Sequence, residues 1–98
     1  VAQSEVLTIV QCFEAAMVDN SKVGYQNEGI NFESFTSFDE LFKLDLVEAY
    51  NYISDINLPE YIELIEDDNG YLKYVNSADG IEILYDTDER VFKQTIIY

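Results

Sequence analysis

The first nineteen residues show the clearest hydrophobic pattern in the chain. At about 100° per residue, the angular spacing of an α-helix, seven apolar side chains fall on one uninterrupted arc about 120° wide. These side chains are Ala2, Val6, Ile9, Val10, Phe13, Ala16 and Met17. Polar residues fill most of the other side, and the apolar residues Leu7, Ala15 and Val18 are interspersed with them. The pattern predicts an amphipathic helix over residues 1–19 whose apolar stripe packs on a core.

The pattern stops after Asp19, and a polar stretch punctuated by glycines reaches to about residue 35. Connections of this length are uncommon in small domains, and they often lie on the surface. Three aromatic side chains, Tyr25, Phe32 and Phe35, are expected to pin this loop onto the body of the domain.

Two short helices are predicted after the loop. Ser37 and Glu40 have the spacing of a capping box, in which the Ser37 hydroxyl accepts from the N–H of residue 40 and the Glu40 carboxylate accepts from the N–H of Ser37. Asp45 and Glu48 repeat this signature, and one straight helix would place the Asp45 carboxylate in the apolar face, where it is costly. The inward residues would be Phe38, Leu41 and Phe42 in the first helix, and Leu46, Ala49, Tyr50 and Ile53 in the second.

From residue 60 the hydrophobic period becomes that of strands. Runs at 61–65, 71–75, 81–85 and 91–98 are separated by turns rich in Asp, Asn and Gly. Asn69-Gly70 is the strongest of these turn signals, because this dipeptide favours a tight hairpin. Four strands joined by short turns predict an antiparallel meander, and the opening helix is its natural cover.

The predicted fold class is therefore α+β: a long N-terminal amphipathic helix packed on a C-terminal antiparallel meander of about four strands. A chain of 98 residues has room for one core, so we expect one domain over residues 1–98. Within it, the helix occupies 1–19, the loop and short helices 20–59, and the sheet 60–98.

The charge balance excludes several classes of partner. Twenty acidic residues face five basic ones, which gives a formal net charge of -15, although 48% hydrophobic residues are enough for a folded domain. The basic residues are Lys22, Lys43, Lys73, Arg90 and Lys93. Direct binding of nucleic acid or of an anionic membrane surface needs more cations than this. The acidity instead favours a basic partner or a divalent cation.

The residues that most enzymes rely on are scarce. The sequence has no histidine, so the usual general base and the usual zinc ligand are absent. It has no phosphate-binding glycine loop and no nucleophile elbow. Cys12, the single cysteine, cannot form an internal disulfide and is expected to be a mostly buried thiol. We therefore expect no enzyme, no catalytic or cofactor-binding residues and no cofactor.

One metal hypothesis concerns the turns. Asp67, Asp68 and Asn69 could bind calcium together with Asp79 or with the acidic turn at 86–89, because calcium prefers several oxygen ligands on loops. The EF-hand spacing is missing, and Asp and Asn also occur in turns for backbone reasons. Turn chemistry is the favoured interpretation, so no metal site is predicted.

Three stretches together resemble the soluble part of a type IV pilin or a type II secretion pseudopilin. They are VAQSEVLTIVQCFEAAMVDN at 1–20, SFDELFKLDLVEAYNYISDINLP at 37–59, and the closing meander. The resemblance implies a structural subunit that self-assembles into surface filaments used for adhesion, motility or secretion. It also implies that an apolar membrane-anchoring segment precedes Val1, which would explain a start without methionine. The expected location is then the cell surface or an extracellular pilus.

This sequence departs from the family pattern in two ways. Cys12 cannot form the C-terminal disulfide of many Gram-negative pilins, which points to a Gram-positive or minor pilin. The charge of -15 is also high for a subunit that packs against copies of itself, so assembly would need basic patches, cations or minor-subunit status. Leu7, Ala15 and Val18, on the helix face away from the sheet, would be available to neighbouring subunits.

An alternative function comes from the charge alone. Acidic inhibitors that mimic DNA are also small and poor in lysine and histidine, and they bind basic nucleic-acid-binding proteins by imitating a phosphate array. On that interpretation Val1 follows a removed methionine and the protein is cytoplasmic. An immunity or adaptor protein with one basic partner is a third possibility that the sequence does not separate from the mimic.

Overall fold

The computed structural model describes residues 2–19, 30–54 and 56–98. Its elements are α1 (Ala2–Val18), the 3-10 helix η2 (Phe32–Ser34), α2 (Phe38–Leu41), α3 (Leu46–Ser54), β1 (Ile62–Glu66), β2 (Leu72–Asn76), β3 (Ile81–Asp86) and β4 (Val91–Ile97). The predicted α+β class, with a long helix, short helices and then four antiparallel strands, is confirmed.

Helix α1 is amphipathic as its spacing predicts. Its buried residues are Val6, Ile9, Val10, Phe13 and Ala16, and Ala2 and Met17 are partly buried beside them. The Phe13 ring lies at the centre of an aromatic cluster, with its centroid 6.1 Å from Phe32, 5.9 Å from Phe38 and 6.1 Å from Tyr50. A single residue of α1 therefore ties η2, α2 and α3 to the opening helix.

The middle segment confirms one of the two capping predictions. The Asp45 side chain accepts a hydrogen bond from the Glu48 N–H at 3.2 Å, and the Asp45 carbonyl accepts from the Ala49 N–H at 2.9 Å, so Asp45 is the N-cap of α3. The four residues predicted to face inward from this helix, Leu46, Ala49, Tyr50 and Ile53, are all buried.

The predicted capping box at Ser37 is wrong. Ser37 occupies the N-cap position of α2, but its side chain makes no capping hydrogen bond within the described residues. The Glu40 carboxylate reaches back one residue further than expected and accepts from the Thr36 N–H at 3.0 Å and from the Thr36 hydroxyl at 3.2 Å. In the loop before it, Phe32 is buried and Phe35 partly buried, as expected, whereas Tyr25 lies outside the described residues.

The four strands form one sheet in the order β1-β2-β3-β4, with every neighbouring pair antiparallel. Alternate residues of the first three strands face the core, among them Leu64, Tyr74 and Ile83. Strand β4 lies at one edge and is mostly exposed, and a register shift between Leu84 and Tyr85 interrupts its pairing with β3.

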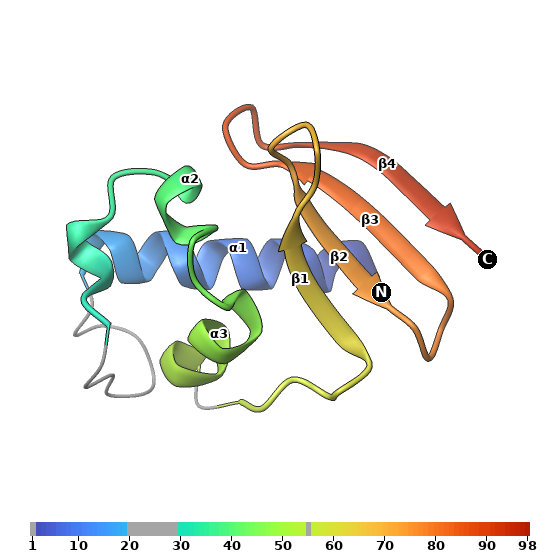
Figure 1. Cartoon of the computed structure of the whole chain (residues 1–98), viewed down its shortest axis with the longest axis horizontal. Helices are drawn as coiled ribbons and strands as arrows, with labels where there is room; N and C mark the ends of the chain where they lie inside the picture. Colours follow the sequence, from blue (N-terminus) through green and yellow to red (C-terminus); the bar gives the residue numbers. More distant parts are fainter. Residues whose placement is uncertain (1, 20–29, 55) are drawn as a thin grey trace.

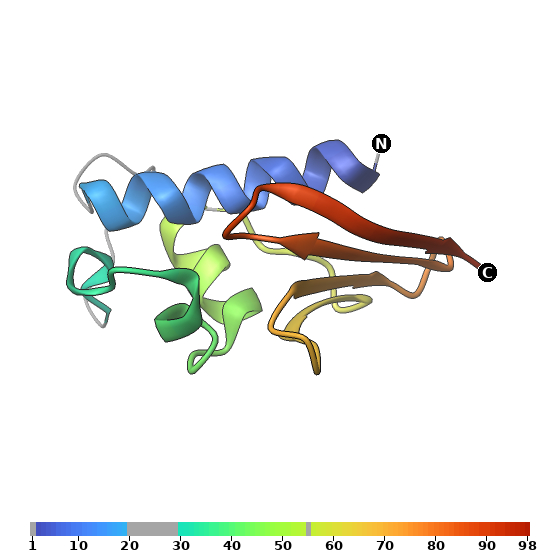
Figure 2. The same cartoon turned by 90° about the horizontal axis from the view of Figure 1, so that it is seen from above.

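Helix α1 spans two halves of the domain (Figures 1 and 2). Its N-terminal part lies over the sheet, and Gln3 at this end donates to the Thr95 hydroxyl of β4 at 3.2 Å. Its C-terminal part packs on η2 and α3. The sequence predicts that the helix covers the meander; the structure shows that the short helices take up the other half of its apolar stripe.

Candidate functional site

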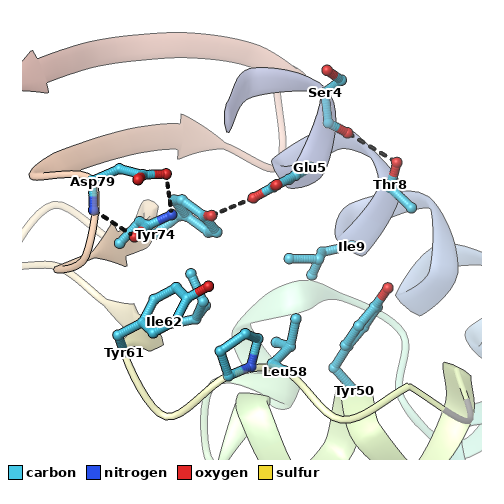
Figure 3. A pocket seen from close by; sticks show the side chains of 12 residues that line it. Ser4, Glu5, Thr8, Ile9, Tyr50, Leu58, Tyr61, Ile62, Tyr74 and Asp79 are labelled. Atoms are coloured by element: carbon cyan, nitrogen blue, oxygen red, sulfur yellow. Dashed lines mark hydrogen bonds between the residues drawn. The ribbon is translucent and has the colours of Figure 1, made fainter. Parts of the chain in front are cut away.

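A pocket of about 400 Å³ opens between the N-terminal part of α1 and the segment that leads into β1 (Figure 3). Its apolar lining consists of Ile9 from α1, Leu58 and Pro59 from the connection after α3, and Ile62 from β1. Helix α1, the connection after α3 and β1 thus each contribute apolar residues to the pocket. The Asn51 side chain fixes that connection by accepting from the Leu58 N–H at 2.9 Å.

A hydrogen bond between Tyr74 and Glu5 crosses one wall of the pocket. Tyr74 faces inward from β2 and is 1% exposed, and its hydroxyl donates to the carboxylate of Glu5. Glu5 stands one helical turn before Ile9, so both side chains point to the same side of α1. Burial raises the pKa of Tyr74 well above its ordinary value, and the bond to Glu5 raises it further. The Tyr74 hydroxyl therefore remains a donor to Glu5 at neutral pH.

A second carboxylate, that of Asp79, stands at the rim of the pocket. The buried Asn76 amide donates to Asp79 Oδ2 at 3.1 Å and accepts from the Asp79 N–H at 3.0 Å, which closes the turn between β2 and β3. Among the described residues the ion pairs engage Glu14, Glu82, Asp86 and Glu89. Neither Glu5 nor Asp79 has a lysine or arginine partner in that part of the chain, so the pocket has a net negative lining.

Tyrosine rings form the remaining walls. Tyr50 from α3 and Tyr61 from the start of the β1 segment approach the pocket from different sides (Figure 3). Tyr61 is 45% exposed and forms part of the mouth, whereas Tyr50 is buried. The lining thus combines an apolar floor, aromatic walls and two carboxylates. This composition is suited to binding, because pockets of this kind orient a ligand with a few polar groups above an apolar surface.

The acidic turns do not assemble into one site. The β1–β2 and β3–β4 turns lie at one end of the sheet and the turn with Asp79 at the other (Figure 1). The Asp67 carboxylate accepts from the N–H groups of Asn69 and Tyr71 at 3.0 and 2.8 Å. Within the described residues no group of three or more metal-ligating side chains is placed to hold a metal ion. The Asp67 carboxylate therefore satisfies backbone groups of its own turn.

Apolar side chains also lie on the outer side of α1. Leu7 is 37% and Val18 83% exposed, and Ala15 is also exposed. The prediction that these three side chains lie on the side of α1 away from the core is therefore confirmed. Cys12, at the margin of the stripe, is half-buried, and burial raises the pKa of its thiol. None of the described helices is long and apolar enough to span a membrane.

The sequence did not reveal the pocket, because its walls come from four separate segments. The nearest signals were the position of Glu5 beside the apolar arc and the inward alternation of Tyr74. Comparison with protein-family models, with curated proteins and with solved structures finds no match for this chain.

Proposed function

We propose that this domain is a non-catalytic assembly subunit, the globular part of a pilin-like filament protein. The observation that carries the proposal is the two-sided character of α1. One side of this helix is buried in the core of its own domain, while Leu7, Ala15 and Val18 on the other side are exposed. Exposed apolar side chains on a helix offer contacts on which a helix of another subunit can pack.

The order of the elements gives further support. A long helix followed by a loop with short helices and then by an antiparallel meander is the order that the resemblance to pilins implies. In this arrangement the helix and the sheet form the body of the subunit, and the outer side of the helix faces the filament. Leu7, Ala15 and Val18 lie on that side among exposed polar residues, which include Ser4, Thr8 and Gln11.

The charge sets a condition on assembly. Three of the basic residues form ion pairs within the molecule: Lys73 with Glu82 at 3.2 Å, Arg90 with Glu14 at 2.7 Å, and Lys93 with Glu89 at 3.5 Å. Copies with a net charge of -15 therefore repel each other, since few cations are left for contacts between subunits. Filaments of this protein would need screening by cations or a more basic neighbouring subunit.

The test is the natural product in its own cells. Filaments sheared from the cell surface are examined by electron microscopy with an antibody to this domain, and the mass and N-terminal sequence of the product are determined. We expect the domain in filaments, and a product with an apolar N-terminal extension. Leu7→Ser with Val18→Ser should reduce the filament yield at least about tenfold, because it removes the apolar surface of α1. Ile56→Ser, which removes an exposed apolar residue of the connection after α3, is the matched control.

Binding of a basic nucleic-acid-binding protein is the second candidate, and the unbalanced surface charge is the observation that favours it. Because Lys73, Arg90 and Lys93 are paired internally, they do little to offset the acids that face solvent. A product found soluble in the cytoplasm and bound to a DNA-binding protein would overturn the filament proposal. In that case DNA should compete with this protein for the partner, and the competition should weaken as salt is added.

A further inference from the structure

We propose that the pocket between α1 and the start of β1 binds an alkylammonium group, that is, a protonated amine on a short hydrocarbon stem. This inference does not rest on the filament function. It concerns a cavity lined by α1, the connection after α3 and the sheet.

The charge of the lining selects a cation. Glu5 and Asp79 both line the pocket, and in the described part of the chain neither forms an ion pair. Each carboxylate is held in place by a neutral donor, the Tyr74 hydroxyl for Glu5 and the Asn76 amide for Asp79. A hydrogen bond from a neutral donor orients a carboxylate but leaves its charge uncompensated. An anionic ligand would face two negative charges here, so the pocket disfavours anions.

The aromatic walls favour an organic cation. Tyr50, Tyr61 and Tyr74 line the same pocket (Figure 3), and the face of a tyrosine ring attracts a cation within about 6 Å of its centre. Recognition of ammonium groups by carboxylates and aromatic rings together is a common use of this interaction. A hard ion such as calcium instead prefers six to eight oxygen ligands, and the described residues place no such set here.

The apolar floor accounts for the hydrocarbon stem. Ile9, Leu58 and Ile62 line the base, and the volume of about 400 Å³ lies within the range of small-molecule pockets. A bare ammonium ion would leave this surface in contact with water, whereas a chain of four or five methylene groups would cover it. A lysine side chain and a free diamine both present this chemistry, and the experiment distinguishes them.

The test is a titration followed by two-dimensional NMR, with cadaverine and Nα-acetyl-lysine amide as cationic probes and pentanol as the neutral probe. We expect both amines to shift the signals of Ile9, Ile62 and Tyr74 saturably, and pentanol to bind at least about tenfold more weakly. Tighter binding of the lysine amide assigns a protein lysine as the source of the group, and tighter binding of cadaverine assigns a free amine. Equal affinity for pentanol, or tighter binding of calcium chloride at the same signals, would overturn the proposal.

Variants separate this site from general attraction to an acidic protein. Glu5→Gln and Asp79→Asn each remove one charge, and each should weaken amine binding about tenfold. Glu63→Gln is the matched control, because Glu63 is exposed on the opposite face of the sheet and its loss changes the net charge by the same amount. Tyr61→Leu keeps an apolar mouth and removes the ring, so it should weaken amine binding and leave pentanol unaffected. Urea unfolding checks that each variant is folded, and equal losses in Glu63→Gln and Glu5→Gln would refute the site.

Discussion

The Tyr74 hydroxyl makes the free energy of unfolding depend on pH in the alkaline range. Burial and the bond to Glu5 raise its pKa above the ordinary value of about 10, which the unfolded chain retains. The unfolded state therefore releases this proton first as the pH rises. The stabilisation is fully present below about pH 10 and is lost as the pH increases toward the pKa of the folded state. We expect the free energy of unfolding to fall above about pH 10.

Tyr74→Phe tests this assignment by urea unfolding between neutral pH and about pH 12. At neutral pH the variant should be less stable by about 1–2 kcal/mol, because the Glu5 carboxylate loses its donor. Its further loss of stability at alkaline pH should be shallower than that of the wild type. It should not vanish, since burial also raises the pKa of Tyr50 and Tyr85.

The two turn glycines test backbone strain. Gly70 and Gly80 both have positive φ, at 82° and 67°, a region that is unfavourable for residues with a Cβ. A Cβ on Gly70 would meet no described atom within 4 Å, and one on Gly80 would lie 3.4 Å from the Tyr98 carbonyl oxygen, which is ordinary van der Waals contact. Gly70→Ala and Gly80→Ala should therefore each destabilise the domain by about 1 kcal/mol, the conformational term alone. Thermal unfolding measures both losses, and a much larger loss for Gly80→Ala would show that a Cβ does not fit beside Tyr98.

At the scale of elements, the two helix caps give a matched pair. The Asp45 carboxylate accepts from the Glu48 N–H at the start of α3, whereas the Ser37 side chain makes no such bond to a described residue at the start of α2. Asp45→Ala should lower the free energy of unfolding by about 1 kcal/mol. Ser37→Ala should change it by less than about 0.5 kcal/mol. Chemical denaturation of both variants is the measurement, and a large effect of Ser37→Ala would show that its hydroxyl caps α2 in solution.

The comparison of these two caps also shows which features of helices and strands can be predicted from sequence. Periodicity identified α1, α3 and the strands to within one or two residues, because burial of a stripe or of alternate residues dominates their energetics. The segment at Ser37 has the residue types of a capping box, but the Glu40 carboxylate accepts hydrogen bonds from Thr36 instead of from the Ser37 N–H. Local spacing does not decide between two such bonds of similar strength. The 3-10 helix at Phe32–Ser34 was missed for a related reason, since three residues carry too little pattern.

At the scale of the whole molecule, the candidate site is the part that the sequence could not predict. The pocket joins Glu5 to Tyr74, which are 69 residues apart, and it also needs the connection held by Asn51. The local sequence pattern accounts for each of these residues as part of a helix or a strand, so none of them indicates a pocket by itself. The packing of α1 against the sheet brings Glu5 and Tyr74 together, and that packing involves side chains from several elements.

The net charge of -15 gives a prediction for the whole molecule. The domain measures 38 × 26 × 20 Å, and the screening length in about 10 mM salt is about 30 Å, so nearly all of its charges interact at low salt. At about 1 M salt this length falls to about 3 Å and the repulsion is removed. Added salt also weakens the internal ion pairs, but exposed pairs contribute at most about 1 kcal/mol each. The repulsion among fifteen unbalanced charges outweighs them, so sodium chloride should stabilise the domain.

Urea unfolding at low and high sodium chloride measures this effect, and we expect the midpoint to rise with salt. The matched variant is Asp68→Asn with Asp88→Asn, which changes two exposed turn residues and reduces the net charge from -15 to -13. This variant should be more stable at low salt, and its stability should depend less on salt than that of the wild type. A midpoint that falls as salt is added would mean that local pairs such as Arg90 with Glu14 outweigh the overall repulsion. In that case local pairs would set the salt dependence of folding, while copies with a net charge of -15 would still repel each other and filament assembly would still need screening by cations.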